Sequence, residues 1–346
     1  MPNQYNETFF RGKVLQILNE SAQEQFGFVE NKQEISVTLL DGDEAGQVVE
    51  IDHFISPIQS LDSQKLNPGQ TIVLTRNNFQ GENAYQFFEP YRLNSLGGFM
   101  ILFVLITVAV ARVRGITSLL GLAVTLVILL KWMLPQIMAG ANPVITSVIS
   151  AFAIAIITLY LAHGFSRRTT LSVISTLITL LLSFLLAMLA VSGAQLFGLG
   201  SEEAAYLSFG QFQNLDLRGL LLGAIVIGAL GVLDDITTAQ TAVVDELKKA
   251  DHRFRFKELY HRGLSVGKEH ITSLVNTLVI AYVGASLPVF LLLVNSDRPL
   301  WVILNNEFMA EEIIRTLVGS TTLVLAVPIS TAIAAYAYAK KSQQSL

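Results

Sequence analysis

From Leu93 onward the chain alternates long apolar runs with short polar breaks, and this pattern limits the possible folds more than any other feature. A helix needs about 20 apolar residues to cross about 30 Å of hydrocarbon. We therefore predict a membrane all-α helical bundle of about seven transmembrane helices: Leu93–Ala111, Thr117–Met133, Val144–Ala162, Thr170–Val191, Leu220–Thr241, Ile271–Val294 and Ile313–Tyr338.

The composition agrees with a membrane protein and excludes several other classes. Hydrophobic residues make up 52% and charged residues 14%, against about 25% charged in soluble domains. The absence of cysteine excludes disulfides, thiol catalysis, zinc-thiolate sites and iron–sulfur clusters. A net charge of −4 provides no basic surface for nucleic acid. We predict no cofactor.

Residues 1–92 form a separate region with 13 acidic and 6 basic residues, so domains are predicted at 1–92 and 93–346. Short runs rich in Val, Ile, Thr and Phe, separated by turn residues, predict a small β-barrel or β-sandwich. Its expected role is docking, with ligand binding as the alternative. The predicted strands are Phe9–Leu18, Ile35–Leu40, Gln47–Phe54 and Thr71–Arg76, with a loop over Phe54–Leu66.

Basic residues predict the orientation of the bundle. Lys and Arg follow the first, third, fifth and seventh apolar runs and are scarce in the other breaks. The positive-inside rule then places the N-terminal module outside and the C-terminus in the cytoplasm. A basic segment at Leu247–Lys268 is predicted as a cytoplasmic loop against anionic headgroups of the lipid bilayer. An external module needs a signal or anchor, and Met1–Phe10 contains no hydrophobic core of a signal peptide. We expect a hydrophobic segment ahead of Met1; the alternatives are an N-terminal tail that crosses unaided and the opposite orientation.

The fifth apolar run contains two adjacent carboxylates, Asp234 and Asp235, about 15 Å from its cytoplasmic end by helical rise. Insertion scales give about 2.5–3.5 kcal/mol for a charged side chain at the centre of a membrane helix. The pair therefore needs polar partners, water or protonation. Three further residues share one helical face with Asp234 by their spacing, namely Thr238, Thr241 and Asp245.

The sixth run supplies possible partners, since it runs antiparallel to the fifth. Asn276 is expected at the level of the two aspartates, and His270 nearer Asp245; Ser273 and Thr277 complete the set. Carboxylate, amide and hydroxyl oxygens suit a small hard cation, and a buried carboxylate suits a proton relay. Interhelical hydrogen bonding without transport is the alternative reading of this polar seam.

Enzyme activity is not expected. Intramembrane aspartyl proteases need aspartates on two helices, whereas Asp234, Asp235 and Asp245 all lie on one. A diphosphate–Mg²⁺ site needs a second acidic cluster at the same depth, and Glu311 and Glu312 are expected at the outer side.

Several stretches resemble the YibE/F family of bacterial multipass membrane proteins. The most specific are IGALGVLDDITTAQTAVVDEL at 227–247 and GKEHITSLVNTLVIAYVGASLPVFL at 267–291. The resemblance implies a multispanning bundle in the bacterial inner membrane after an extracytoplasmic β-rich module. It also implies a second YibE/F-like subunit, or another copy of the chain, as a partner. It carries over no catalytic or binding residue.

Two functions follow as hypotheses. In the first, the protein is permease-like and moves, or couples to, a small cation or proton between the fifth and sixth runs. In the second, it is a non-transporting scaffold or assembly factor whose β module holds a partner.

Overall fold

The computed structural model describes residues 8–25, 28–55, 64–79, 82–209 and 212–341. The chain divides into two compact units, Met1–Ile106 and Thr107–Leu346. The strands end at Pro90 and the first helix begins at Leu93, so secondary structure changes close to the predicted division at residue 92.

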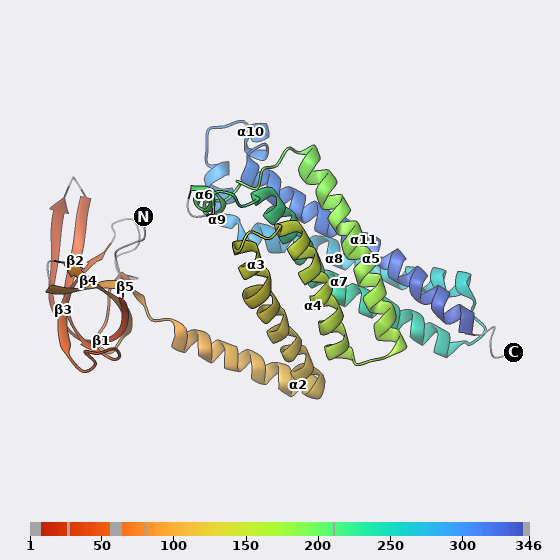
Figure 1. Cartoon of the computed structure of the whole chain (residues 1–346), viewed down its shortest axis with the longest axis horizontal. Helices are drawn as coiled ribbons and strands as arrows, with labels where there is room; N and C mark the ends of the chain where they lie inside the picture. The colour runs from red at the N-terminus through yellow and green to blue at the C-terminus, as the bar shows by residue number, and fades with distance from the viewer. Residues whose placement is uncertain (1–7, 26–27, 56–63, 80–81, 210–211, 342–346) are drawn as a thin grey trace. The chain divides into compact units, whose positions relative to one another are not determined.

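The first unit contains one antiparallel sheet of five strands in the order β3-β2-β1-β4-β5 (Figure 1). Its strands are β1 (Thr8–Gln25), β2 (Phe28–Leu39), β3 (Val48–Ile55), β4 (Thr71–Phe79) and β5 (Glu82–Pro90). The sheet curls into a half-barrel, because the central strand β1 bends at two register shifts and pairs with β2 along one stretch and β4 along another. A single curled sheet replaces the sandwich alternative.

Alternation of apolar residues along the strands fills the half-barrel. Ile35, Val37 and Leu39 of β2 are buried, as are Ile72 and Leu74 of β4. The predicted strands correspond to β1–β4, whereas β5 is absent from the prediction, since its sequence ENAYQFFEP is too polar to read as a strand. The predicted loop Phe54–Leu66 lies largely outside the described residues.

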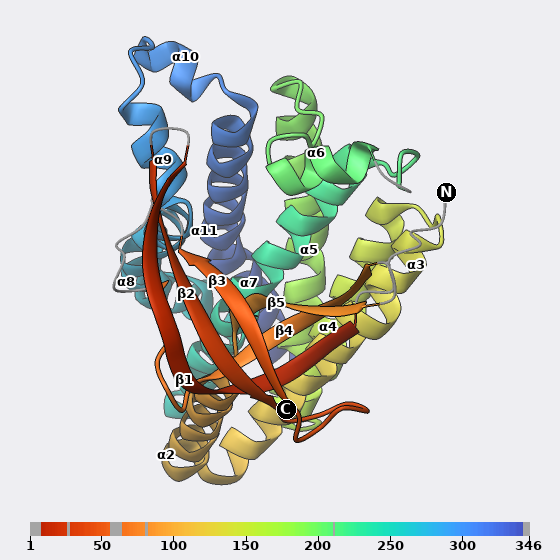
Figure 2. The ribbon, with the colours of Figure 1, turned by 90° about the vertical axis from the view of Figure 1, so that its left-hand side faces the viewer.

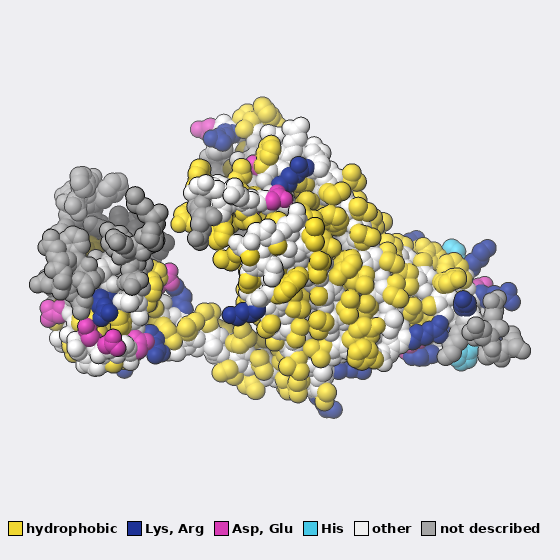
Figure 3. All heavy atoms as spheres, in the orientation of Figure 1, with side chains coloured by type: hydrophobic (Ala, Val, Ile, Leu, Met, Phe, Trp, Pro, Cys, Tyr) yellow, Lys and Arg dark blue, Asp and Glu magenta, His cyan; other side chains and the backbone are white. Residues whose placement is uncertain are grey.

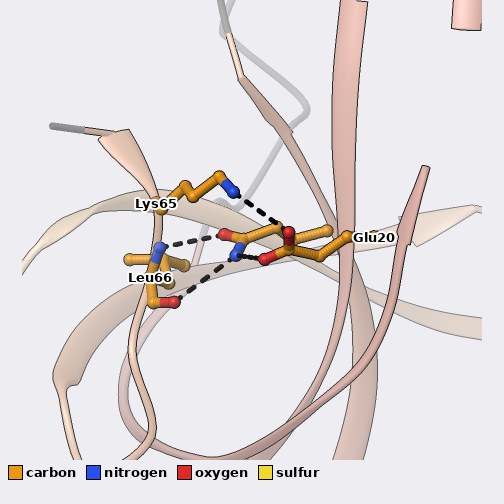
Figure 4. A network of polar contacts seen from close by, with 4 residues as sticks. Glu20, Lys65 and Leu66 are labelled. Carbon is orange, nitrogen blue, oxygen red and sulfur yellow. Dashed lines mark hydrogen bonds and ion pairs between the residues drawn. The ribbon is translucent and has the colours of Figure 1, made fainter. Parts of the chain in front are cut away.

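A buried glutamine fastens the segment before β4 to the sheet (Figure 4). Gln33 is fully buried and accepts a hydrogen bond from the Leu66 amide at 2.9 Å, while its own amide donates to Glu20 at 2.7 Å. Lys65 pairs with the other oxygen of Glu20 at 3.0 Å. These bonds, first from Gln33 and then from Lys65, hold the pKa of Glu20 below its ordinary value.

The second unit is helical, and α2 joins it to the first. Its long helices are packed in a bundle, with α7 against α4, α5, α8 and α11. Figure 2 shows these helices after a turn of 90° about the vertical axis of Figure 1. The long helices are α2 (Leu93–Val127), α4 (Pro143–His163), α5 (Arg167–Gly193), α7 (Leu217–Ala250), α8 (Phe256–Ala285) and α11 (Glu307–Lys341). The shorter ones are η1 (Ile128–Met133), α3 (Leu134–Met138), α6 (Glu202–Phe209), α9 (Leu287–Val294) and α10 (Leu300–Leu304).

Five helices of the described chain are long and apolar enough to span a membrane, or six if α8 and α9 form one bent span. The predicted count of seven is not reproduced. The first two predicted spans join into one helical stretch, Leu93–Met138, interrupted by the non-helical backbone of Arg112 (φ 54°). The sixth predicted span is broken beside Pro288, where α8 and α9 meet at 73°.

The predicted cytoplasmic loop Leu247–Lys268 is wrong in its structure. Helix α7 continues to Ala250 and α8 begins at Phe256, so the connection is only five residues long. Hydropathy could not show this, because charged helix ends that project beyond a membrane read as loop. Figure 3 shows Lys and Arg gathered at this end of the helical unit, beside a largely apolar visible face.

Small and hydroxyl-bearing residues let the helices approach closely. Gly223 of α7 leaves room for Ser147 of α4, since a Cβ at that position would overlap the serine side chain. Thr176 of α5 and Thr237 of α7 share a hydrogen bond of 2.7 Å. Gln240 of α7 donates to the Gly263 carbonyl of α8 and to Thr331 of α11. This agrees with the packing of helices in membranes.

Candidate functional site

The two aspartates of α7 lie in a pocket between α7, α4 and the second part of α2. Its volume is about 380 Å³. Asp234 is half-buried and Asp235 is exposed. The floor is apolar, formed by side chains such as Ile154, Leu159 and Leu230. The other polar side chains of the lining are Ser118, Thr125, Thr158 and His163.

The carboxylate of Asp234 is short of hydrogen-bond donors. Its Oδ1 is buried and has no hydrogen-bond partner among the described residues. Its Oδ2 lies 3.4 Å from the Thr158 hydroxyl, but that hydroxyl also donates to the Ile154 carbonyl at 2.8 Å. A hydroxyl has one hydrogen, so the shorter bond takes it and leaves lone pairs facing Asp234.

Thr238 does not supply the missing donor either. Its hydroxyl lies 2.8 Å from the Asp234 carbonyl and 3.1 Å from the Asp235 carbonyl, so its hydrogen goes to the backbone. Neither aspartate forms an ion pair within the described parts of the chain. The arrangement thus favours a protonated Asp234, which could donate to the Thr158 oxygen.

Charged groups surround the mouth of the pocket. His163, the last residue of α4, is close enough to Asp235, Arg114 and Arg168 for their charges to act on it. Thr158 lies five residues before this helix end, about 7.5 Å at helical rise. Asp234 is therefore nearer the end of α4 than its position in the longer helix α7 implies.

The predicted partners on α8 do not face the aspartates. Two glycines of α8 lie against α7. A Cβ atom added to Gly263 would lie 3.0 Å from the Val244 side chain, and one added to Gly267 would lie 3.0 Å from the Gln240 side chain. Continued along both helices, this antiparallel register brings Ser273 level with Asp234, whereas Asn276, which was expected at that level, lies three residues further along α8. The side of the helix differs, however: His270, Ser273, Asn276 and Thr277 are all exposed, and the aspartates face α4 instead.

The remaining predicted residues lie along α7 outside the pocket. Thr241 is fully buried and donates to the Thr237 carbonyl at 2.7 Å. Asp245 pairs with Lys249 at 2.7 Å and accepts a hydrogen bond from Tyr338 of α11. The structure therefore brings together Asp234, Asp235 and Thr238, and it separates them from Thr241 and Asp245.

Four polar residues of the pocket were absent from the prediction: Ser118, Thr125, Thr158 and His163. Thr158 and His163 are polar residues at the end of an apolar run, which is a signal that sequence could have provided. Among the described residues, no group of three or more His, Asp or Glu side chains is placed to hold a metal ion.

Long apolar helices and a polar pocket within their bundle define a multipass membrane protein. The model of the YibE/F-like protein family matches residues 99–340. The chain belongs to this family, which confirms the resemblance seen in the sequence. No curated protein matches the chain, and no solved structure does either.

Proposed function

We propose that this is a permease-like membrane protein in which Asp234 takes up and releases a proton. The proton would exchange through the pocket between α2, α4 and α7, with Asp235 and His163 at its mouth. This replaces the predicted pathway between the fifth and sixth apolar runs.

One observation carries the proposal: the buried Oδ1 of Asp234 has no hydrogen-bond partner among the described residues, and its Oδ2 has only a 3.4 Å contact with the Thr158 hydroxyl, which also donates to the Ile154 carbonyl at 2.8 Å. An ionised carboxylate in such a place is costly. A proton removes the charge and gives the group a hydrogen to donate. A cation is the weaker candidate, because its ligands would be one half-buried carboxylate, one exposed carboxylate and hydroxyls already bonded to the backbone.

The experiment is a proton-flux measurement on the full chain in proteoliposomes, driven by an imposed membrane potential and followed with an internal pH dye. Wild-type protein should admit protons, and Asp234→Asn should lose most of this flux. Asp297→Asn removes an exposed aspartate far along the chain in sequence, and it should behave as wild type. Equal flux in Asp234→Asn and wild type would overturn the proposal and favour the scaffold hypothesis.

We further propose the bacterial inner membrane as the location, with the N-terminal module outside. If the two parts of α2 on either side of Arg112 cross the membrane separately, the basic ends of α5 and α7 lie inside, as the positive-inside rule requires. Protease added to right-side-out vesicles should then cut the N-terminal module and spare the segment that joins α7 to α8.

The exposed polar face of α8 supports a second subunit as partner. Amide and hydroxyl groups facing hydrocarbon gain by bonding to another helix, at about 0.6 kcal/mol for each bond. A second copy of the chain, or another YibE/F-like subunit, could cover Ser273 and Asn276. Oxidative cross-linking of Asn276→Cys in membranes should yield dimers if the partner is a second copy, whereas Ser265→Cys serves as a control nearer the helix start.

A further inference from the structure

The half-barrel leaves one seam without backbone pairing. The two edge strands of the sheet are β3 and β5, which each pair with one neighbour only. Curling brings them together, with some Cα atoms within 8 Å, yet no ladder joins them in the described sheet. Figure 2 shows β4 and β5 crossing β2 and β3 at a steep angle, which keeps the two edges from running alongside one another.

A groove of about 950 Å³ follows this seam. Its volume is at the upper end of the range of about 300–1,000 Å³ that is typical of ligand sites. It is lined by residues of β3 from Val49 to Phe54 and of β5 from Ala84 to Phe87. Aromatic rings also line the groove. The ring of Phe54 is exposed, and the rings of His53 and Phe87 pack edge to face with their centroids 4.3 Å apart.

The edge of β3 is protected against an added strand by acidic side chains only. Natural edge strands are commonly blunted by charged side chains, lysine above all, by proline or by a bulge. The sequence of β3, VVEIDHFI, contains neither lysine nor proline, and it pairs with β2 without a register shift. The outer backbone groups of β3 pair with no other strand of the described sheet, so they can accept another extended chain, since strand addition needs only a free edge.

The charge of the groove selects the partner. Four carboxylates line it, from Glu34, Glu44, Glu50 and Asp52, and none of its lining residues is Lys or Arg. Lys32 pairs with Glu34 and Asp52, and Arg76 pairs with Glu44. Glu50 is exposed and forms no ion pair in the described parts of the chain. A negative charge is thus left at the middle of the open edge.

We propose that this groove binds an extended basic segment of another protein, which adds as a strand to the edge of β3. Backbone hydrogen bonds to β3 would hold the segment, and basic side chains at alternate positions would face Glu50 and Asp52, which lie on the same face of the strand. This site is independent of the proton site proposed for the helical unit.

The test uses the full chain in nanodiscs and a synthetic peptide of eight residues, the length of β3, with alternating lysine and valine. Binding is measured by fluorescence anisotropy. A peptide with glutamate in place of lysine tests the charge, and one with N-methylated backbone nitrogens tests the strand pairing. Both should bind at least about tenfold more weakly than the lysine peptide, which corresponds to about 1.4 kcal/mol.

Two variants locate the site on the protein. Glu50→Lys should weaken binding of the lysine peptide at least about tenfold. Asp43→Lys makes the same charge change at an exposed residue outside the groove lining and should retain most of the affinity. Equal binding of all three peptides, or unchanged affinity in Glu50→Lys, would overturn the proposal. A dimer of the chain that excludes the peptide and is lost in Glu50→Lys would overturn it as well, since the occupant would then be a second copy.

Discussion

The hydroxyl of Thr158 on α4 faces the Asp234 carboxylate on α7 at 3.4 Å while donating its hydrogen to the backbone of its own helix at 2.8 Å. The Thr158 oxygen and the Asp234 carboxylate oxygen thus face one another as two hydrogen-bond acceptors. Such a contact is unfavourable for an ionised carboxylate and favourable for a protonated one.

Removing the Thr158 oxygen should therefore change the spectrum of protonated Asp234. In Thr158→Val the acid loses an acceptor, so its C=O stretching band in infrared difference spectra should move to higher wavenumber. Thr158→Ser keeps the oxygen and should leave the band in place. Identical bands in the valine and wild-type proteins would show that the acid does not donate to this residue.

Water should reach the mouth of the pocket. Because the chain has no cysteine, Ser118→Cys introduces a single thiol at an exposed position of the lining. A small membrane-impermeant thiol reagent should label it from one side of a sealed vesicle. Leu180→Cys, at a fully buried position, should stay unlabelled. Absence of labelling at Ser118 from both sides would mean that the pocket is closed to water.

The close contact of α4 with α7 should be sensitive to a single methyl group. In Gly223→Ala the new Cβ would overlap the Ser147 side chain. Overpacking of this kind typically costs about 1–3 kcal/mol. We expect a lower midpoint of thermal unfolding in detergent. Gly284→Ala adds a methyl group where no atom lies within 4 Å, and its midpoint should be close to that of wild type.

Acid should loosen the β module through His53. Burial lowers the pKa of this ring below its ordinary value of 6.5, although the Gln64 carbonyl opposes the shift. The folded module therefore binds fewer protons than the unfolded chain. The contribution of neutral His53 to the free energy of unfolding is fully present above pH 6.5, and it falls as the pH drops from there through the lowered pKa. Hydrogen exchange of β3 should speed up over that interval in wild type and change less in His53→Phe. Equal acceleration in both would exclude His53 as the cause.

Sequence patterns predicted the positions of residues along the helices to within about one turn, but not the side of the helix on which they lie. Spacing placed Asn276 at the level of Asp234 and Asp235, whereas the antiparallel register of α8 against α7 puts Ser273 opposite Asp234. The side that each helix presents to its neighbours was not predictable. In an apolar run every face is hydrophobic, so the amphipathic pattern that orients a soluble helix is missing. For that reason the facing residue on α4, Thr158, was not identified.

The ends of the helices were not predicted, for a related reason. Hydropathy indicates where a chain enters the hydrocarbon of the membrane, whereas backbone hydrogen bonding decides where a helix ends. The basic ends of α7 and α8 remain helical beyond the apolar runs, and Arg112 interrupts α2 without a proline or glycine to announce it. The β module followed its turn signals in part. The prediction missed the polar strand β5, the end of β1 as far as Gln25 and the start of β2 at Phe28.

The unequal lengths of α7 and α4 bear on how such a chain can be inserted at all. Asp234 lies halfway along the 34 residues of α7, which suggests a position at the membrane midplane. The shorter helix α4, however, ends at His163, five residues beyond the Thr158 side chain that faces Asp234. The free-energy cost of inserting a carboxylate depends on its distance from the nearest headgroups. That distance is shorter where a neighbouring helix ends early. Asp234 can thus lie within an apolar helix at a lower free-energy cost than its position along α7 suggests.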